Sequence, residues 1–233
     1  MPRCRPKPKV ACSPARTNSE NAVNTRPRKA KALSWLPRRI VLTALPAHPK
    51  RLYLTFDDGP DPLVTPLLAD LLATHSAKAT FFVVGREAEK HPDLVARLVA
   101  DGHRIGNHSY SHARFDAIAQ SVQDEEVART DRILAAHDGR ATHLFRPPYG
   151  ALPASLLLHS ALRGRQIAYW SVDSLDYQDK SACDLVDGLR REPPRSGDIV
   201  LMHDRARTVE MLRTMIPEWI AAGFALEALP AAA

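Results

Sequence analysis

From residue 50 onward, the hydrophobic positions follow two alternating periods. Short apolar runs rich in β-branched and aromatic residues are typical of strands, whereas apolar residues that recur every three to four positions are typical of amphipathic helices. The pattern predicts an α/β protein with about seven strands and a largely parallel sheet. The predicted strands are 52–54, 80–84, a third that ends near Asn107, 143–146, 166–172, 198–203 and 224–229. The predicted helices are one after Pro62, one from Pro92 to Gly102, and 118–137, 154–162, 183–190 and 209–220.

Clusters of polar residues follow most of these strands directly. Alternation alone does not separate an open, doubly wound sheet from a closed barrel. In both folds, however, functional residues gather at the carboxyl ends of the strands. We therefore expect one functional site assembled from several loops. The clusters at strand ends are 57–58, 108–112, 146–149, 173–177 and His203.

Length and charge divide the chain into two parts. The 233 residues fit one α/β domain with an appendage. The first 50 residues carry 12 Lys and Arg against one acidic residue, so the net charge of +6 originates there. This segment also holds 8 of the 19 prolines and no Phe or Tyr, a composition typical of disorder. We predict a disordered basic tail at residues 1–48 and a folded domain at residues 49–233.

Composition constrains partners and location only weakly. No aromatic interleaving or known binding module accompanies the basic tail, so no nucleic-acid partner is expected. No apolar run approaches the roughly 20 residues of a membrane span. Residues 40–45 make a poor secretory signal, which leaves the location open: cytoplasmic as the chain stands, or periplasmic or secreted if its true start differs. Three cysteines suggest neither a disulfide framework nor a metal cluster, and we expect free thiols.

Two adjacent carboxylates, Asp57 and Asp58, follow the first strand and precede Gly59-Pro60. Neighbouring side chains on a strand point to opposite faces, so the two carboxylates need not share one task. Such a pair suits a site in which one carboxylate binds a metal and the other moves a proton. The alternative is a solvated turn, because Asp, Gly and Pro are common turn residues.

His108 and His112 lie four residues apart after the third strand. On a helical turn the two imidazoles would share a face, and imidazole nitrogen is a common zinc ligand. With Asp58 they would form an Asp-His-His site that leaves positions open for water and substrate, as expected of catalysis. The alternative is a pair of surface histidines.

Arg146 and His203 end two further strands. A guanidinium can hold a carboxylate in a fixed plane through two hydrogen bonds, so Arg146 is a candidate to orient a catalytic Asp. His203 has a candidate partner in Asp173 or Asp176, and a carboxylate partner tunes an imidazole toward the protonated form of a general acid. Leu201, on the same strand face as His203, would supply an apolar wall. The alternatives are a surface arginine on a rigid loop and a structural histidine.

Five short motifs occur in order along the chain. They are Thr-Phe-Asp-Asp-Gly-Pro at 55–60, His-Ser-x-x-His at 108–112, Arg-Pro-Pro-Tyr at 146–149, Asp-Ser-x-Asp-Tyr at 173–177 and Leu-x-His at 201–203. In this order they resemble the motifs of the polysaccharide deacetylase family, the NodB-homology domain of carbohydrate esterase family 4. The resemblance runs from about Arg51 to the C-terminus and implies that residues 49–233 form a catalytic domain.

The resemblance implies a distorted (β/α) barrel that removes acetyl groups from N-acetylated or O-acetylated sugars. It also implies a divalent metal, usually zinc, with cobalt, nickel or manganese as alternatives. Asp58, His108 and His112 correspond to the metal ligands and Asp57 to the general base. Arg146 corresponds to the residue that positions the base.

Further roles follow from the same resemblance. The backbone N–H of Tyr149 corresponds to the donor to the oxyanion, and His203 to a general acid tuned by Asp173. Tyr177 stands where the family more often has tryptophan, which leaves the shape of the pocket open. With Leu201, it would form the pocket for the acetyl methyl group.

Three functions follow as hypotheses. The first is a metal-dependent N-deacetylase that acts on N-acetylglucosamine units of chitooligosaccharides or peptidoglycan. The second is an O-acetyl esterase for xylan, or another amidase, on the same scaffold. The third is a non-catalytic glycan-binding protein, and against it stands the presence of every residue that the chemistry requires. The glycan, the metal and the oligomeric state are not determined by the sequence.

Overall fold

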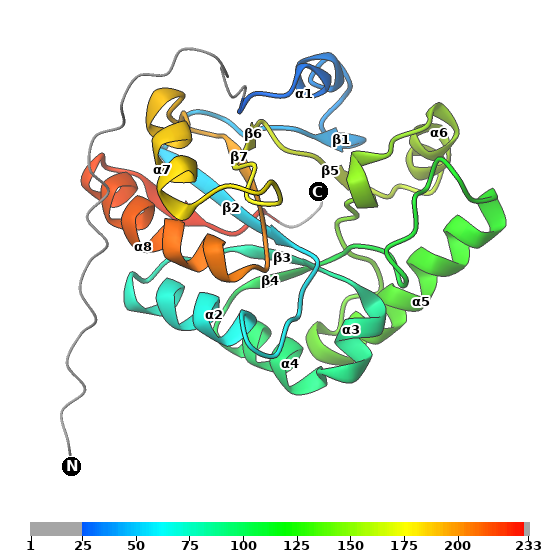
Figure 1. The fold of residues 1–233 in the computed structure, drawn as a ribbon. Coiled ribbons are helices and arrows are strands. Elements are labelled where there is room, and N and C mark those ends of the chain that lie inside the picture. The colour runs from blue at the N-terminus through cyan, green and yellow to red at the C-terminus, as the bar shows by residue number, and fades with distance from the viewer. Residues whose placement is uncertain (1–24, 231–233) are drawn as a thin grey trace.

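Residues 25–230 are described by a computed structural model and form an α/β fold (Figure 1). Strands and helices alternate along most of these residues, as predicted. The strands are β1 (Val41–Leu42), β2 (Arg51–Asp57), β3 (Thr80–Val83), β4 (Arg104–Asn107), β5 (Ile167–Ala168), β6 (Val172–Asp173), β7 (Ile199–His203) and β8 (Ala225–Glu227). The α-helices are α1 (Arg28–Leu33), α2 (Thr65–Thr74), α3 (Gly85–Lys90), α4 (Pro92–Ala100), α5 (Gln120–Asp138), α6 (Ala154–Leu162), α7 (Ala182–Arg191) and α8 (Ala206–Ala221).

The larger sheet is built around β2. This strand pairs with β3 on one side and with β7 on the other, and β4 and β6 extend the sheet to the order β4-β3-β2-β7-β6. β8 pairs with the first residues of β2. Each of these pairings is parallel, which confirms the prediction from the alternation of strands and helices.

The sheet curves into a distorted barrel through residues 145 and 167–173. Phe145 forms parallel bridges with Asn107 at the end of β4 and with Ile167 in β5. The segment that begins at β5 continues into β6, which pairs with β7. The path of strands therefore returns to β7, and β1 pairs with β5. The expected fold class, a distorted parallel barrel with surrounding helices, is confirmed.

Local sequence signals explain where several helices begin and end. α2 has a proline in its first turn and α4 begins with Pro92, positions where the missing N–H costs no hydrogen bond. Ser181 and Asp184 form a capping box that starts α7. Gly139, at φ 72°, ends α5 in the left-handed conformation that favours glycine. Figure 1 shows α7 and α8 beside one another, with α2 and α4 below them.

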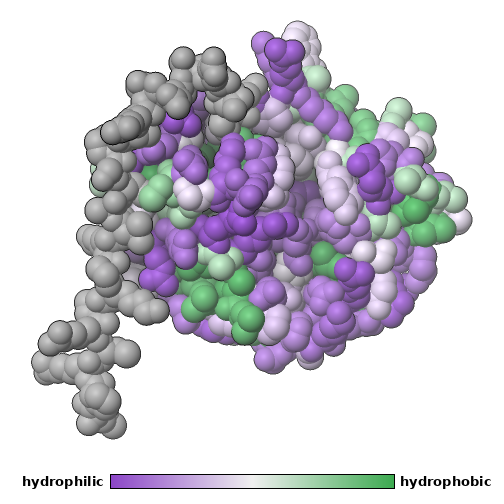
Figure 2. Space-filling view, in the orientation of Figure 1, coloured by the Kyte–Doolittle hydropathy of each residue, from purple (hydrophilic) through white to green (hydrophobic). Residues whose placement is uncertain are grey.

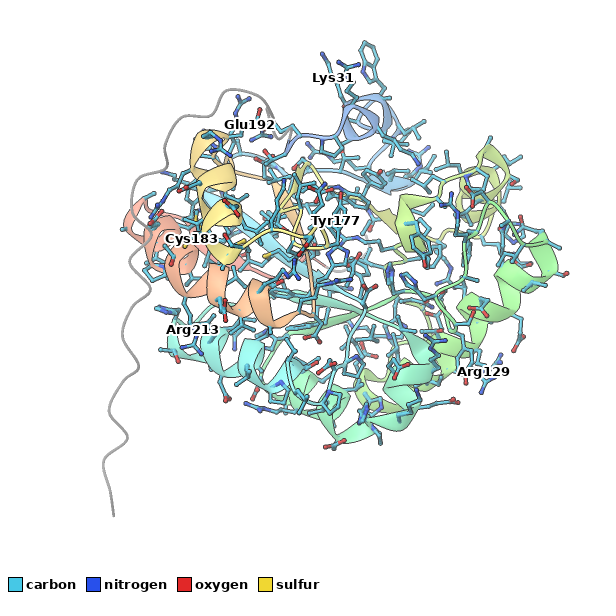
Figure 3. The ribbon with its side chains drawn as sticks, in the orientation of Figure 1. Lys31, Arg129, Tyr177, Cys183, Glu192 and Arg213 are labelled. Atoms are coloured by element: carbon cyan, nitrogen blue, oxygen red, sulfur yellow. The ribbon has the colours of Figure 1, made fainter. Side chains whose placement is uncertain are left out.

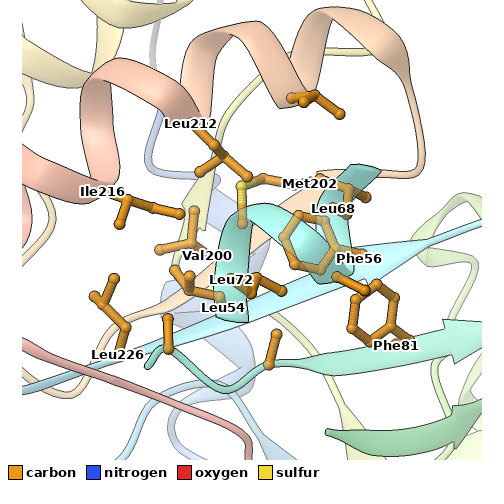
Figure 4. Close-up of a cluster of buried hydrophobic side chains, with 14 of the residues drawn as sticks. Leu54, Phe56, Leu68, Leu72, Phe81, Val200, Met202, Leu212, Ile216 and Leu226 are labelled. Carbon is orange, nitrogen blue, oxygen red and sulfur yellow. The ribbon is translucent and has the colours of Figure 1, made fainter. Parts of the chain in front are cut away.

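The side chains of β2 divide between two cores. Leu52, Leu54 and Phe56 pack among buried residues of α2, α8 and the adjacent strands (Figure 4). Tyr53 belongs instead to the second core, inside the barrel. Since residues alternate along a strand, Asp57 shares the face of Tyr53 and is directed toward the barrel interior. The hydrophobic pattern of one strand therefore decides where a catalytic candidate points.

Residues 25–48 are folded, so the predicted disordered tail is wrong for this part of the chain. α1 and β1 lie here, and β1 pairs with β5. A basic, proline-rich segment cannot build its own core, but its few apolar residues are buried against the barrel, which supplies the remaining surface. The folded unit begins no later than Thr25 instead of at residue 49. The remaining part of the predicted tail, residues 1–24, lies outside the described residues.

Two predicted strands differ in detail from the observed ones. In place of a strand at 143–146, single bridges form at Phe145, because Pro147 and Pro148 follow and lack the N–H groups that a ladder requires. The predicted strand 166–172 is divided into β5 and β6. Both differences occur where the barrel closes.

Two further features concern the surface and the thiols. Cys183 takes part in a disulfide bond, so the expectation of a free thiol there is wrong. No helix within residues 25–230 is long and apolar enough to cross a bilayer. The face shown in Figure 2 is largely hydrophilic, with separate hydrophobic areas among the polar side chains.

Candidate active site

The polar clusters come together in one pocket at the carboxyl ends of the barrel strands. The pocket has a volume of about 400 Å³. Each site residue predicted from the sequence lines it, except Arg146, which is buried behind Asp57. The lining residues are Asp57, Asp58, His108, His112, Tyr149, Gly150, Trp170, Asp173, Tyr177, Leu201, His203 and Arg205.

The turn after β2 separates the two adjacent carboxylates. Asp57 ends the strand and is 3% exposed, whereas Asp58 has a φ of 76°, which turns the chain away from the strand. Gly59 follows in close contact with Asp204, and a Cβ atom there would lie 2.4 Å from a carboxylate oxygen of Asp204. A larger residue here would have to displace the Asp204 carboxylate, so glycine favours the turn that displays Asp58.

Asp58, His108 and His112 form a compact cluster. Asp58 Oδ1 lies 3.1 Å from Nε2 of His112 and 3.6 Å from Nε2 of His108. One ligand atom from each of the three residues lies within 4.8 Å of the others. The imidazoles belong to an irregular loop instead of the expected helical turn, and His112 itself has a φ of 62°. The predicted residues meet, but through a different local conformation.

The cluster has the properties of a cation site. Nδ1 of His108 lies 2.6 Å from the carbonyl oxygen of Arg146 and donates a hydrogen bond to it, which leaves the Nε2 lone pair directed at the cluster. Asp58 Oδ1 is buried, and no donor within residues 25–230 forms a hydrogen bond with it. A divalent cation fits these facing electron pairs and the open side toward the pocket.

A buried guanidinium holds the second carboxylate. Nη1 of Arg146 lies 2.8 Å from both Asp57 Oδ1 and Thr55 Oγ1. The other nitrogens of Arg146 donate to the carbonyl oxygens of Ala168 and Tyr169. The contact with Asp57 is therefore one hydrogen bond instead of the two that the sequence suggested. The remaining donors fix Arg146 to the barrel wall.

His203 is paired with Asp176. Nδ1 of His203 lies 2.7 Å from Asp176 Oδ1, and the other carboxylate oxygen accepts hydrogen bonds from the His203 backbone N–H and from Thr208. Burial lowers the pKa of His203, but the hydrogen bond and charge of Asp176, with the charges of Asp57 and Asp58, outweigh it and raise the pKa to about 9.

From the sequence, Asp173 and Asp176 are both candidate partners of His203, and the resemblance favours Asp173; the structure corrects that pairing. Its carboxylate accepts hydrogen bonds from the Leu175 backbone N–H at 2.9 Å and from the Tyr177 hydroxyl at 3.4 Å. Burial raises the pKa of Asp173 to about 6. Leu175, at φ 60°, reverses the chain between the two acids, so Asp176 reaches His203. The motif contains both carboxylates, and only the turn geometry distinguishes them.

Aromatic and apolar side chains form the walls of the pocket. Leu201 lines it as predicted, and the ring of Tyr177 lies edge-on to His203 at 5.4 Å. Tyr149 contributes an exposed ring 4.7 Å from that of His112. Trp170 and Arg205 also line the pocket and were not predicted. Trp170 lies in an apolar strand segment whose pattern resembles the core, and Arg205 follows the last motif without a signal of its own.

A buried carboxylate on one flank of a cation site and a protonated imidazole on the other suit the hydrolysis of an acyl group. Comparison with known proteins identifies the family. Residues 44–167, more than half of the chain, match the family model described as Polysaccharide deacetylase. The chain belongs to this family of hydrolases, carbohydrate esterase family 4, whose members depend on a metal.

Named relatives and a solved structure are similar over most of the chain. A chitooligosaccharide deacetylase of Azorhizobium caulinodans is 35% identical and covers 77% of this chain and 92% of that protein. A peptidoglycan-N-acetylglucosamine deacetylase of Bacillus cereus is 34% identical and covers 84% of this chain and 73% of that protein. The crystal structure of the Bc1960 peptidoglycan N-acetylglucosamine deacetylase has a TM-score of 0.80 and 32% identity, with coverage of 85% and 94%.

Proposed function

We propose that this protein is a metal-dependent deacetylase that hydrolyses the N-acetyl group of N-acetylglucosamine units in chitooligosaccharide or peptidoglycan-type glycans. One observation carries the proposal: a candidate base, a cation site and a candidate acid surround the same pocket. The names of the relatives support an N-acetylglucosamine substrate. The acetyl-bearing nitrogen of such a unit requires a proton donor, which His203 provides.

Asp58, His108 and His112 would hold the cation. When bound, a divalent cation polarises the acyl carbonyl and lowers the pKa of water in the site. We propose zinc, because two imidazoles and one carboxylate form a common ligand set for zinc in hydrolases. Cobalt, nickel or manganese would suit the same donors. Metal analysis of the purified protein, with removal by chelation and replacement by each ion, tests this assignment.

Asp57 acts as the general base. It takes a proton from the attacking water, and the hydrogen bond from Arg146 keeps its carboxylate in place during the transfer. The backbone N–H of Tyr149 donates to the oxygen that becomes negatively charged. Tyr149 adopts a φ of 57° beside the pocket, a conformation that presents its backbone on the tight loop 148–150.

His203 acts as the general acid. An amide nitrogen leaves only after it gains a proton, because an amide anion is too basic to depart from the tetrahedral intermediate. A pKa of about 9 keeps the imidazole protonated at neutral pH, with Asp176 as the cause. Leu201 and Tyr177 form the apolar wall that we assign to the acetyl methyl group.

An O-acetyl esterase for acetylxylan is the second candidate, because an ester leaving group needs the same base and cation but less help from an acid. Acetate release from chitooligosaccharides, peptidoglycan and acetylxylan, measured side by side with the metal-loaded protein, tests the two. Faster release from N-acetylglucosamine substrates is expected. Preference for acetylxylan would reverse the proposal, and no release from any substrate would favour a glycan-binding protein without activity.

A further inference from the structure

The residues that precede the family match contact the pocket. Residues 25–33 lie ahead of the matched residues 44–167, yet Thr25 and Lys29 in this segment form hydrogen bonds with pocket loops. One loop carries Tyr149 and Gly150, and the other begins with Asp173. We name residues 25–33 the brace.

The first end of the brace is Thr25, which is 1% exposed. Its backbone N–H and hydroxyl donate to the same oxygen of Glu192, at 2.9 and 2.6 Å. Its carbonyl oxygen accepts a hydrogen bond of 2.7 Å from the backbone N–H of Asp173. Glu192, which follows α7 and is labelled in Figure 3, therefore fixes Thr25. Thr25 in turn fixes the start of the loop that leads to Asp176.

The second contact of the brace with a pocket loop is made by Lys29, in α1. Its ammonium group donates a hydrogen bond of 2.5 Å to the carbonyl oxygen of Gly150. Gly150 has a φ of 60°, and a Cβ atom there would lie 2.8 Å from the Trp170 ring. The loop is therefore packed against Trp170 at one point and held by Lys29 at another. Tyr149, whose backbone is the candidate oxyanion donor, lies next to Gly150.

The brace is itself anchored to the barrel. Ala30 and Leu33 are buried in the same core cluster as Trp170. Arg26 forms a salt bridge of 2.8 Å with Asp198, directly before β7. Because the segment has buried apolar contacts and an ion pair of its own, it is fixed well enough to hold both loops.

We propose that residues 25–33 brace the active site, with Lys29 as a positioning residue for the Tyr149 loop and Thr25 as a positioning residue for the loop that leads to Asp176. The inference rests on the proposed function, because the Tyr149 loop and the loop that leads to Asp176 matter through the roles in hydrolysis proposed above. It adds a requirement that lies outside the five motifs and ahead of the matched residues.

The kinetic test compares full-length variants of two lysines in α1. Lys29→Met removes the donor to Gly150, and Lys31→Met removes the same charge from an exposed position of the same helix (Figure 3). Loss of this charge-assisted hydrogen bond in Lys29→Met should lower kcat about tenfold. KM should change little, because the Tyr149 N–H that Lys29 positions acts on the transition state. Lys29→Arg keeps a cationic donor and should recover most of the activity. Equal kcat for Lys29→Met and Lys31→Met would overturn the assignment of Lys29.

A second measurement does not depend on activity. Hydrogen exchange of the Gly150 and Ala151 amides should be faster in Lys29→Met than in wild type, and unchanged in Lys31→Met. In Glu192→Ala, which releases Thr25, the Asp173 amide should exchange faster, whereas Glu210→Ala on the exposed side of α8 should not affect it. Unchanged exchange at these amides would overturn the brace. If the wild-type protein released no acetate, the proposed function would fail, and the exchange rates would still decide the brace.

Discussion

Two carboxylate pairs flank the same pocket and differ in whether the partner can lose its proton. Arg146 bonded to Asp57 is a guanidinium, which remains charged under all conditions in which proteins fold, although burial lowers its pKa. His203 bonded to Asp176 is an imidazole, which titrates in the accessible range. The first pair therefore fixes a position, and the second sets a proton affinity.

This difference shows how one type of side chain serves two purposes in one site. A carboxylate held by a permanent cation is kept in place for accepting a proton. A carboxylate beside an imidazole favours the protonated form of that imidazole, and here the pKa of His203 is about 9. The two pairs can be separated experimentally, because each should respond differently to substitution, substrate and pH.

The largest effect is expected at the base. Asp57→Asn removes the proton acceptor but keeps the shape, and the rate of acetate release should fall by about 10⁴-fold, the upper range for general acid–base groups. Bound metal should remain, whereas Asp58→Asn should lose it. Metal content and acetate release are measured together on both variants. Retained activity in Asp57→Asn would show that Asp57 is not the general base.

A smaller and substrate-dependent effect is expected at the acid. His203→Gln should lower amide hydrolysis by about 10²–10⁴-fold and lower hydrolysis of an activated acetate ester much less, because a good leaving group departs without a proton. The ratio of the two rates is the measurement. Equal losses on both substrates would indicate that His203 acts in binding or structure.

The pH dependence distinguishes Asp176 from Asp173. A general acid must be protonated, so activity should decline as the pH rises through the His203 pKa of about 9. Asp176→Asn removes the group that raises this pKa, and the alkaline limb should move toward acid by about 1–3 pH units. Asp173→Asn is the matched control and should move it much less. A larger shift from Asp173→Asn would restore the pairing that the sequence suggested.

The same pair affects stability in a direction that follows from its pKa. The folded-state pKa of His203 is raised above the ordinary value of 6.5, so the pair stabilises the fold fully below pH 6.5 and loses this contribution as the pH rises through about 9.

The smallest effect is expected at the wall of the pocket. Tyr177→Trp introduces the residue that the resemblance leads us to expect at this position and also removes the hydroxyl that donates to Asp173. We expect a change of less than about tenfold, mainly in KM, since one apolar contact contributes about 1 kcal/mol. Kinetics on chitooligosaccharides of two lengths measures it. A loss of activity as large as that of His203→Gln would indicate that Tyr177 takes part in proton donation.

The sequence predicts the parts of the site that depend on local periodicity. Strand alternation places Asp57 toward the barrel interior, and the gathering of motifs follows from parallel strands that share one carboxyl edge. The turn at Asp58, whose φ is 76°, separates the second carboxylate from the first and is not visible in that pattern. The choice of Asp176 over Asp173 does not follow from it either, because it depends on the positive φ of Leu175 between them. The conformation around His108 and His112 depends in the same way on residues with positive φ.

The folded state of residues 25–48 was missed for a different reason. Average composition describes whether a segment can build its own core, and this segment cannot. Leu33 and Val41 instead pack in the apolar core of the barrel, whose residues include Phe145 and Ile167, more than 100 positions away. No periodic pattern within the segment itself reveals that surface.

The central strand has a consequence for how the enzyme is made. Thr55, two residues before the proposed base, bonds to Val200 across 145 positions of sequence, and β8 completes the start of the same strand. Contacts between such distant positions form late, because a long loop must close before they stabilise the chain. During synthesis on the ribosome, β2 therefore cannot complete its pairing until nearly the whole polypeptide has emerged. The pocket is assembled only then.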